Sequence, residues 1–140
     1  MTVLRTLIML ALVSGPAAVM AEGSPAPKDS YLYIGWPIEG SVVSAKSFRV
    51  WFGLRNMGIA PAGVDKPMTG HHHLIIDAPL PPMDEEIPAD KNHVHFGKGQ
   101  TETVLKLPRG RHTLQLLLAD HDHIPHDPPV VSRKVTFTVR

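Results

Sequence analysis

Most of the histidines in this chain stand in short groups whose spacing suits metal ligation. There are nine histidines in 140 residues, and three consecutive ones open an apolar segment. An H-x-H pair follows some twenty residues later, and a third group lies in a polar segment rich in aspartate. Neutral imidazole nitrogens are common ligands of zinc and copper. The grouped residues are His71 to His73, His93, His95, His121, His123 and His126.

Alternation along a strand decides which of these side chains can share an ion, since neighbouring residues point to opposite faces. His71 and His73 then lie on one face, whereas His72 lies on the other with two large aliphatic residues and packs inward. The pair His93 and His95 shares a face in the same way. Two such pairs on neighbouring strands would offer four nitrogens to one ion. We predict copper or zinc ligands at His71, His73, His93 and His95, with His121, His123 and His126 as further ligands.

Two other residue types bear on the predicted site. The aspartates Asp120, Asp122 and Asp127 can act as ligands or as acceptors that fix an imidazole tautomer. His112 begins a face of alternating leucines and is interpreted as a structural residue at the edge of the core. With the ordinary histidine pKa near 6.5, the site is expected to lose its ion between about pH 7 and pH 5.

The elements that carry these residues are predicted to be strands, because the apolar pattern has period two. Seven short segments show it, and 14 prolines and 11 glycines separate them. The fold class expected is all-β, an antiparallel immunoglobulin-like β-sandwich of about seven strands. The turn residues Pro108 and Gly110 predict a hairpin between residues 101–107 and 111–119. Three long loops, at 55–70, 80–92 and 120–129, are expected to be functional.

The amino-terminal residues predict export. Residues 1–21 combine Arg5, a short apolar core and small residues at the end, which is typical of a cleaved signal peptide. The apolar run is too short to span a bilayer. We therefore expect a flexible leader at 22–30, one domain at 31–140 and a periplasmic or secreted location with no membrane span after cleavage.

Charge and cysteine content exclude several function classes. Arg5 is the one charged residue among the first 21, so the remainder has equal numbers of basic and acidic residues. No basic field is present to recruit nucleic acid. Cysteine is absent, which excludes disulfides, thiolate ligands and thiol catalysis.

Several longer motifs resemble a known family. The segments GLRNMGIAPAGVDKP, TGHHHLIID, HFGKGQTE and HTLQLLLADHDHIPHDPPV are similar to exported bacterial proteins defined only as domain of unknown function forty-three ninety-nine. This resemblance implies a small secreted β domain with no assigned activity. Separately, HVHFGKG at 93–99 resembles the copper–zinc superoxide dismutase strand that carries two copper ligands, which implies that role for His93 and His95. The chain lacks that family's cysteine pair and zinc-loop histidines.

Three function classes remain open from the sequence. The leading hypothesis is an exported domain that binds copper or zinc through clustered histidines. The second is a non-catalytic interaction module whose loops present Arg55, His72 and the other histidines to a protein or cell-envelope partner. The third is a metal-dependent enzyme with Asp120 or Asp122 as general base. The sequence favours a protein that is not an enzyme.

Overall fold

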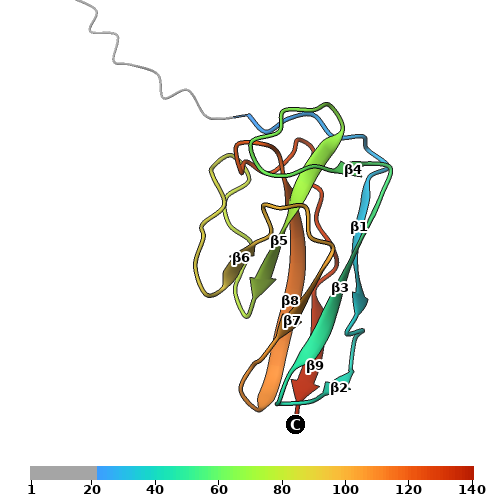
Figure 1. Cartoon of the computed structure of the whole chain (residues 1–140), viewed down its shortest axis with the longest axis vertical. Helices are drawn as coiled ribbons and strands as arrows, with labels where there is room; N and C mark the ends of the chain where they lie inside the picture. The colour runs from blue at the N-terminus through green and yellow to red at the C-terminus, as the bar shows by residue number, and fades with distance from the viewer. Residues whose placement is uncertain (1–21) are drawn as a thin grey trace, which may run out of the picture.

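A computed structural model describes residues 22–140, and this part of the chain is all-β (Figure 1). The predicted signal peptide, residues 1–21, lies outside the described residues. Within 22–140 no helix is long and apolar enough to cross a membrane. The fold class expected from period-two patterning is therefore confirmed at the level of an all-β protein.

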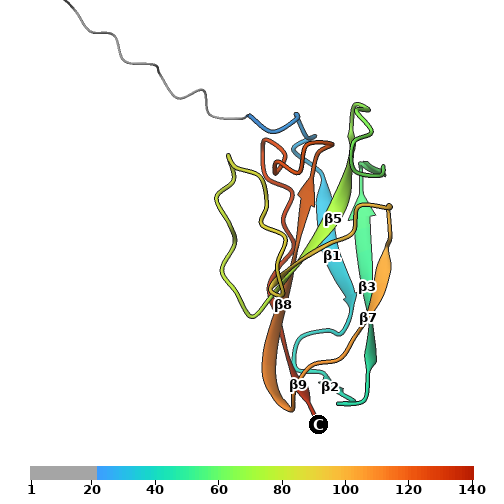
Figure 2. The ribbon, with the colours of Figure 1, turned by 60° about the vertical axis from the view of Figure 1, so that its left-hand side comes forward.

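The strands form two sheets. The smaller sheet has the order β1-β3-β7, and the larger has the order β2-β9-β8-β5-β4, with β6 also paired to β5 on the edge opposite β8. Figure 2 shows the two sheets facing each other. The strands are β1 (Tyr31–Trp36), β2 (Val42–Val43), β3 (Phe48–Arg55), β4 (Gly58–Ile59), β5 (Thr69–Ile76), β6 (His93–His95), β7 (Glu102–Leu105), β8 (Gly110–Ala119) and β9 (Val135–Val139).

The main hydrophobic core lies between the sheets and follows the predicted alternation. In β3, Val50 and Phe52 are buried whereas the intervening Trp51 is exposed. The long strand β8 contributes Leu114, Leu116 and Leu118 to the same core, all without exposed surface. Burial of such side chains contributes roughly 1.5–3 kcal/mol each. This core holds the two sheets in register and fixes the central strand β5.

Residues 22–140 contain nine strands where about seven were expected, and the difference is confined to β2 and β4. Each contains two residues, and each pairs in parallel, β2 with β9 and β4 with β5. The sheets are thus antiparallel with two short parallel pairings. Two-residue bridges carry no periodic apolar signal, so the sequence does not reveal them.

The prediction of a hairpin at Pro108 and Gly110 is wrong. Strand β7 pairs with β3 in the smaller sheet, whereas β8 pairs with β5 and β9 in the larger one. The short connection 106–109 therefore crosses from one sheet to the other. Turn residues mark such a crossing as they mark a hairpin, so the sequence pattern does not distinguish the two connections.

Loops cover the outer face of the larger sheet. A second, smaller apolar cluster lies there, on the side of β5 opposite the main core. It joins Ile75 of β5 to Leu117 of β8 and to Ile87 of the loop 77–92. Figure 2 shows this loop outside the sheet. Side chains of β5 that point away from the main core beside this cluster are consequently covered by the loop 77–92 and not solvated.

Candidate metal centre

Strand β5 is central in its sheet, and alternation along it separates the three consecutive histidines as predicted. It pairs with β8 on one side and with β6 on the other. His72 lies on the main-core side, where its ring is 5.1 Å from that of Phe52. His71 and His73 point to the outer face, and His95 of β6 stands directly opposite His73. Three imidazoles are thereby brought together by strand pairing alone.

A fourth imidazole reaches this group from the loop 120–129. Five of the six ring-centroid distances within the group lie between 4.8 and 5.1 Å, and the sixth, from His73 to His123, is 6.1 Å. The Nε2 atoms of His71 and His73 are 3.1 Å apart. We call this group the histidine cluster; its members are His71, His73, His95 and His123.

Three members of the cluster meet the geometric requirement of a metal site. One ring nitrogen from each of His71, His95 and His123 lies within 4.8 Å of those of the other two. Two nitrogens bound to one tetrahedral zinc ion lie roughly 3.3 Å apart, from Zn–N bonds of 2.0–2.1 Å. Small rotations of the side chains therefore suffice to bring the three nitrogens onto one ion. The fourth ring, His73, lies immediately beside His71.

Burial keeps the inner part of the cluster uncharged. His71 and His73 have 0% and 1% of their surface exposed. Desolvation, followed by repulsion from neighbouring imidazoles, lowers the pKa of His71 to about 4 and that of His73 to about 2. The pKa of His95 is also lowered, first by desolvation and then by His123. At neutral pH both rings are therefore uncharged, which is the form of imidazole that binds a metal ion.

The inner histidines also have ring nitrogens that no protein group satisfies. The Nδ1 atoms of His71 and His73 are buried without a hydrogen-bond partner. Leaving a buried polar atom unpaired costs roughly 1–3 kcal/mol. The short contact between their Nε2 atoms satisfies one donor and one acceptor at most, because each neutral imidazole has a single N–H. Binding of an ion would offset part of this cost, so the donors fit a metal.

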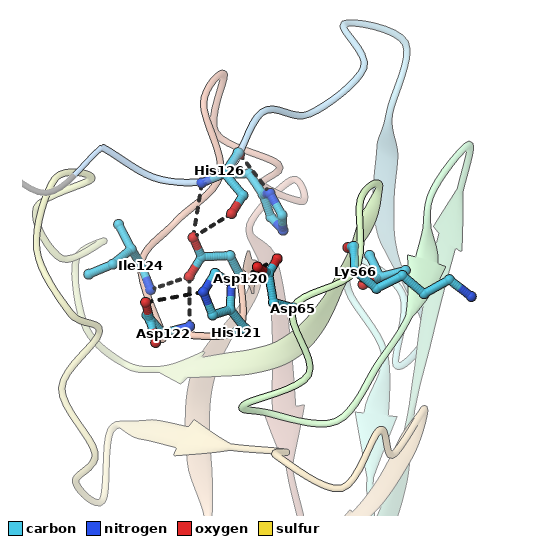
Figure 3. A network of polar contacts seen from close by, with 9 residues as sticks. Asp65, Lys66, Asp120, His121, Asp122, Ile124 and His126 are labelled. Carbon is cyan, nitrogen blue, oxygen red and sulfur yellow. Dashed lines mark hydrogen bonds and ion pairs between the residues drawn. The ribbon is translucent and has the colours of Figure 1, made fainter.

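The backbone that presents His123 is held by a buried carboxylate. Oδ1 of Asp120 accepts hydrogen bonds from the amides of Asp122 and Ile124, at 3.0 and 3.1 Å. Figure 3 shows Asp120 between these amides and the amino-terminal segment drawn in blue. His123 itself has a positive φ of 66°, which is uncommon for a residue other than glycine. The amide of Ile87, in the loop 77–92, donates a hydrogen bond to the carbonyl oxygen of His123 at 3.0 Å and holds the same turn from the other side.

A glycine makes room for the outermost ring. A Cβ atom at Gly97 would overlap Nε2 and Cε1 of His95, so this imidazole lies against the bare backbone of residue 97. His95 is exposed, in contrast to the buried inner pair. The cluster is therefore closed on the side of His71 and His73 and open to solvent on the side of His95. Nothing in the spacing of residues 93–99 indicates this packing role of Gly97.

Two predicted ligands lie near the cluster but bind carboxylates instead. His93 shares a face with His95, yet its Nδ1 is 2.9 Å from Asp90. His121 lies between Asp122, at 3.2 Å, and Asp65, at 3.7 Å. The structure therefore places neither ring in the cluster. Alternation alone does not reveal these local acidic partners.

Two buried histidines are used by the scaffold. His126 bonds the carbonyl oxygen of Ser24 through Nδ1 at 2.9 Å, so this third predicted ligand is also outside the cluster. His72 bonds the carbonyl oxygen of Gln100 at 3.1 Å and is 1% exposed. Desolvation lowers the pKa of His72 to about 4. The expectation that His72 is presented to a partner is wrong, because the main core covers it.

His112 has the structural place predicted for it. Its Nδ1 lies 2.6 Å from Asp77, and its Nε2 lies 2.8 Å from the carbonyl oxygen of Pro108. Partial burial opposes protonation of this ring, but the hydrogen bonds to Asp77 and Pro108 outweigh it and raise the pKa of His112. The two hydrogen bonds hold the start of β8 beside the end of β5.

Comparison with known proteins identifies the family. The family model described as "Domain of unknown function (DUF4399)" matches residues 50–140, and the chain therefore belongs to this family. No curated protein and no solved structure matches the chain significantly. The local likeness of residues 93–99 to copper–zinc superoxide dismutases has no support from these comparisons. All four residues of the histidine cluster lie within the matched range.

Proposed function

We propose that this member of the family binds one copper or zinc ion through the histidine cluster. His71, His95 and His123 would supply three nitrogen donors, with the ring of His73 packed beside His71. The observation that carries this proposal is the convergence of histidines from β5, β6 and the loop 120–129, with donor nitrogens within 4.8 Å. All-nitrogen donor sets suit zinc and copper, whereas magnesium and calcium prefer oxygen ligands.

The open side of the cluster suits an ion that is exchanged. Zinc sites with three protein ligands keep one coordination position for water or another molecule, whereas closed sites with four protein ligands are structural. An ion held by His71, His95 and His123 would be reached from the side of His95, which is exposed. We therefore propose binding or transfer of the ion outside the cytoplasm. The predicted signal peptide supports that location.

The surroundings favour binding over catalysis. The carboxylates considered as general bases have other partners. Asp120 accepts hydrogen bonds at both oxygens, from Asp122, Ile124 and Ser24. Asp122 lies 3.2 Å from Nε2 of His121. A general base must be within hydrogen-bond reach of the proton that it abstracts. These contacts support a metal-binding domain more than a metal-dependent enzyme.

A matched pair of variants on one strand tests the proposal. His95→Gln removes a donor of the cluster, and His93→Gln removes the neighbouring histidine that bonds Asp90. Isothermal titration calorimetry with Cu(II) and with Zn(II) at pH 7 should show one site in the wild type. We expect His95→Gln to lower the affinity by at least 100-fold and His93→Gln to leave it within about threefold. Absence of binding by the wild type, or equal losses in the two variants, would contradict the proposal.

A further inference from the structure

The amino-terminal segment makes an extensive contact with the loop that carries His123. Both the amide and the hydroxyl of Ser24 donate to Oδ2 of Asp120 at 2.9 Å. Two backbone hydrogen bonds add to this contact, from Asp127 N to Ser24 O at 3.1 Å and from Ala26 N to Asp127 O at 2.9 Å. Residues 24–26 thereby form an extra extended segment alongside the loop, for which the sequence predicted only a flexible leader.

The residue before Ser24 must be glycine for this contact to form. A Cβ atom at Gly23 would overlap the carbonyl oxygen of Pro125 and approach the backbone of His126. Overlap with backbone is not relieved by rotating a side chain. The segment therefore lies on the loop only because residue 23 has no side chain, and one added methyl group would displace it.

Asp120 transmits this contact to the cluster. Its Oδ2 binds Ser24, while its Oδ1 binds the amides of Asp122 and Ile124, which flank His123 (Figure 3). The carboxylate is 4% exposed, so it depends on these hydrogen bonds in place of water. Desolvation opposes its ionisation, but the bonds from Ser24, Ile124 and Asp122 outweigh this effect and lower the pKa of Asp120. It therefore remains an acceptor at neutral pH.

The conformation of His123 explains why such support is needed. Its φ of 66° lies in the left-handed region, which is unfavourable for a residue with a side chain and persists only where the surroundings impose it. Support comes from Asp120 on one side and from the amide of Ile87 on the other. Without the first, the ring of His123 would leave the cluster more readily than those of His71 and His73, which a central strand fixes.

We propose that residues 23–26 belong to the metal centre, with Ser24 and Asp120 as positioning residues for the ligand His123. This inference rests on the proposed function. It assigns to the first residues after the predicted signal peptide a role in building the site. Residues 23–26 precede the range matched by the family model, so the domain defined by that model does not include this part of the site.

The test compares variants of the segment in the full chain. Gly23→Ala displaces the segment, Ser24→Ala removes the hydroxyl, and Ser24→Thr retains it. Lys28→Ala, at an exposed residue two positions after this segment, is the control. Loss of groups that orient metal ligands lowers metal affinity by about 10–100-fold. We expect this loss of Cu(II) affinity for Gly23→Ala, about three- to tenfold for Ser24→Ala, and values near wild type for Ser24→Thr and Lys28→Ala.

Two further measurements separate positioning from general stability. In the metal-free protein, hydrogen exchange at the amides of Asp122 and Ile124 should accelerate in Gly23→Ala, while that of β8 remains unchanged. In the Cu(II) form, pulsed electron paramagnetic resonance should count one imidazole fewer than in the wild type. Wild-type affinity or an unchanged imidazole count in Gly23→Ala would overturn the inference alone. Failure of the wild type to bind Cu(II) or Zn(II) would overturn the proposed function as well.

Discussion

Burial of the inner histidines should make metal binding unusually tolerant of acid. Metal ligation requires neutral imidazoles, so protons compete with the ion at each donor. For a histidine with the ordinary pKa of 6.5, the neutral fraction falls about 25-fold between pH 7 and pH 5. Three such donors together would lower the affinity by about 15,000-fold, which is the sharp loss that the sequence alone predicts.

The structure changes this expectation through His71. Desolvation lowers its pKa to about 4, so its neutral fraction falls by only about 1.1-fold over the same range. Replacing one of the three 25-fold factors by this 1.1-fold factor leaves a loss of about 700-fold, and the lowered pKa of His95 reduces the loss further. The total loss should therefore not exceed about 700-fold. His73, with a pKa of about 2, adds no proton competition above pH 5.

A chelator competition measures this difference directly. The affinity for Zn(II) should be determined at pH 7.0, 6.0 and 5.0 against a chelator whose own proton affinity is known. We expect a shallow dependence, with a loss below about 700-fold at pH 5. A loss of 10,000-fold or more would refute the reasoning, because it would mean that His71 takes up a proton as easily as a solvated histidine.

Three other predictions concern single residues. First, desolvation lowers the pKa of His72 to about 4 in the folded protein, whereas the ordinary value of 6.5 holds in the unfolded chain. The unfolded chain therefore takes up a proton at this residue first, and the free energy of unfolding falls as the pH falls from 6.5 to 4. This loss of stability amounts to about 2 kcal/mol between pH 8 and pH 5. In urea unfolding of the metal-free protein, the stability of His72→Gln should depend on pH less than that of the wild type, by the same amount. An unchanged pH dependence would contradict the prediction. Second, Gly97→Ala should displace the exposed ring of His95 and lower the Cu(II) affinity by at least tenfold, while the free energy of unfolding changes by less than about 1 kcal/mol. Calorimetry measures the affinity and urea unfolding measures the stability. An unchanged affinity would exclude the packing role of Gly97. Third, the buried hydroxyl of Ser132 accepts a hydrogen bond from the amide of Leu116 at 2.8 Å and donates one to the carbonyl oxygen of Arg133. Ser132→Ala should lower the free energy of unfolding by about 1–3 kcal/mol in urea unfolding. A loss below about 0.5 kcal/mol would show that another group takes the place of the hydroxyl.

The sequence predicts the strands and the facing of their side chains because both depend on period-two alternation. His71, His73 and His95 lie on one face of neighbouring strands as the pattern indicates. That two of them are buried does not follow from alternation, since a covering loop decides it. The same pattern places His93 beside His95, yet a carboxylate three residues earlier in the chain binds it.

The loop ligand and its support lie beyond local pattern. Residues 120–129 contain three histidines, and nothing in their spacing selects His123 over His121 or His126. The selection depends on the turn around Asp120 and on Ser24, which is 96 residues away in the sequence. Contacts over such distances are set by the tertiary fold. The crossing at 106–109 resembles a hairpin in sequence for a related reason, since its turn residues do not reveal which sheet the next strand joins.

The most direct test of the metal centre is the position of the ion in crystals of the Zn(II)- or Cu(II)-loaded protein, determined by anomalous scattering at the metal absorption edge. The account predicts one strong peak about 2.0–2.1 Å from a ring nitrogen of each of His71, His95 and His123. A peak at His93, His121 or His126, or no peak within the histidine cluster in crystals that contain the metal, would contradict it.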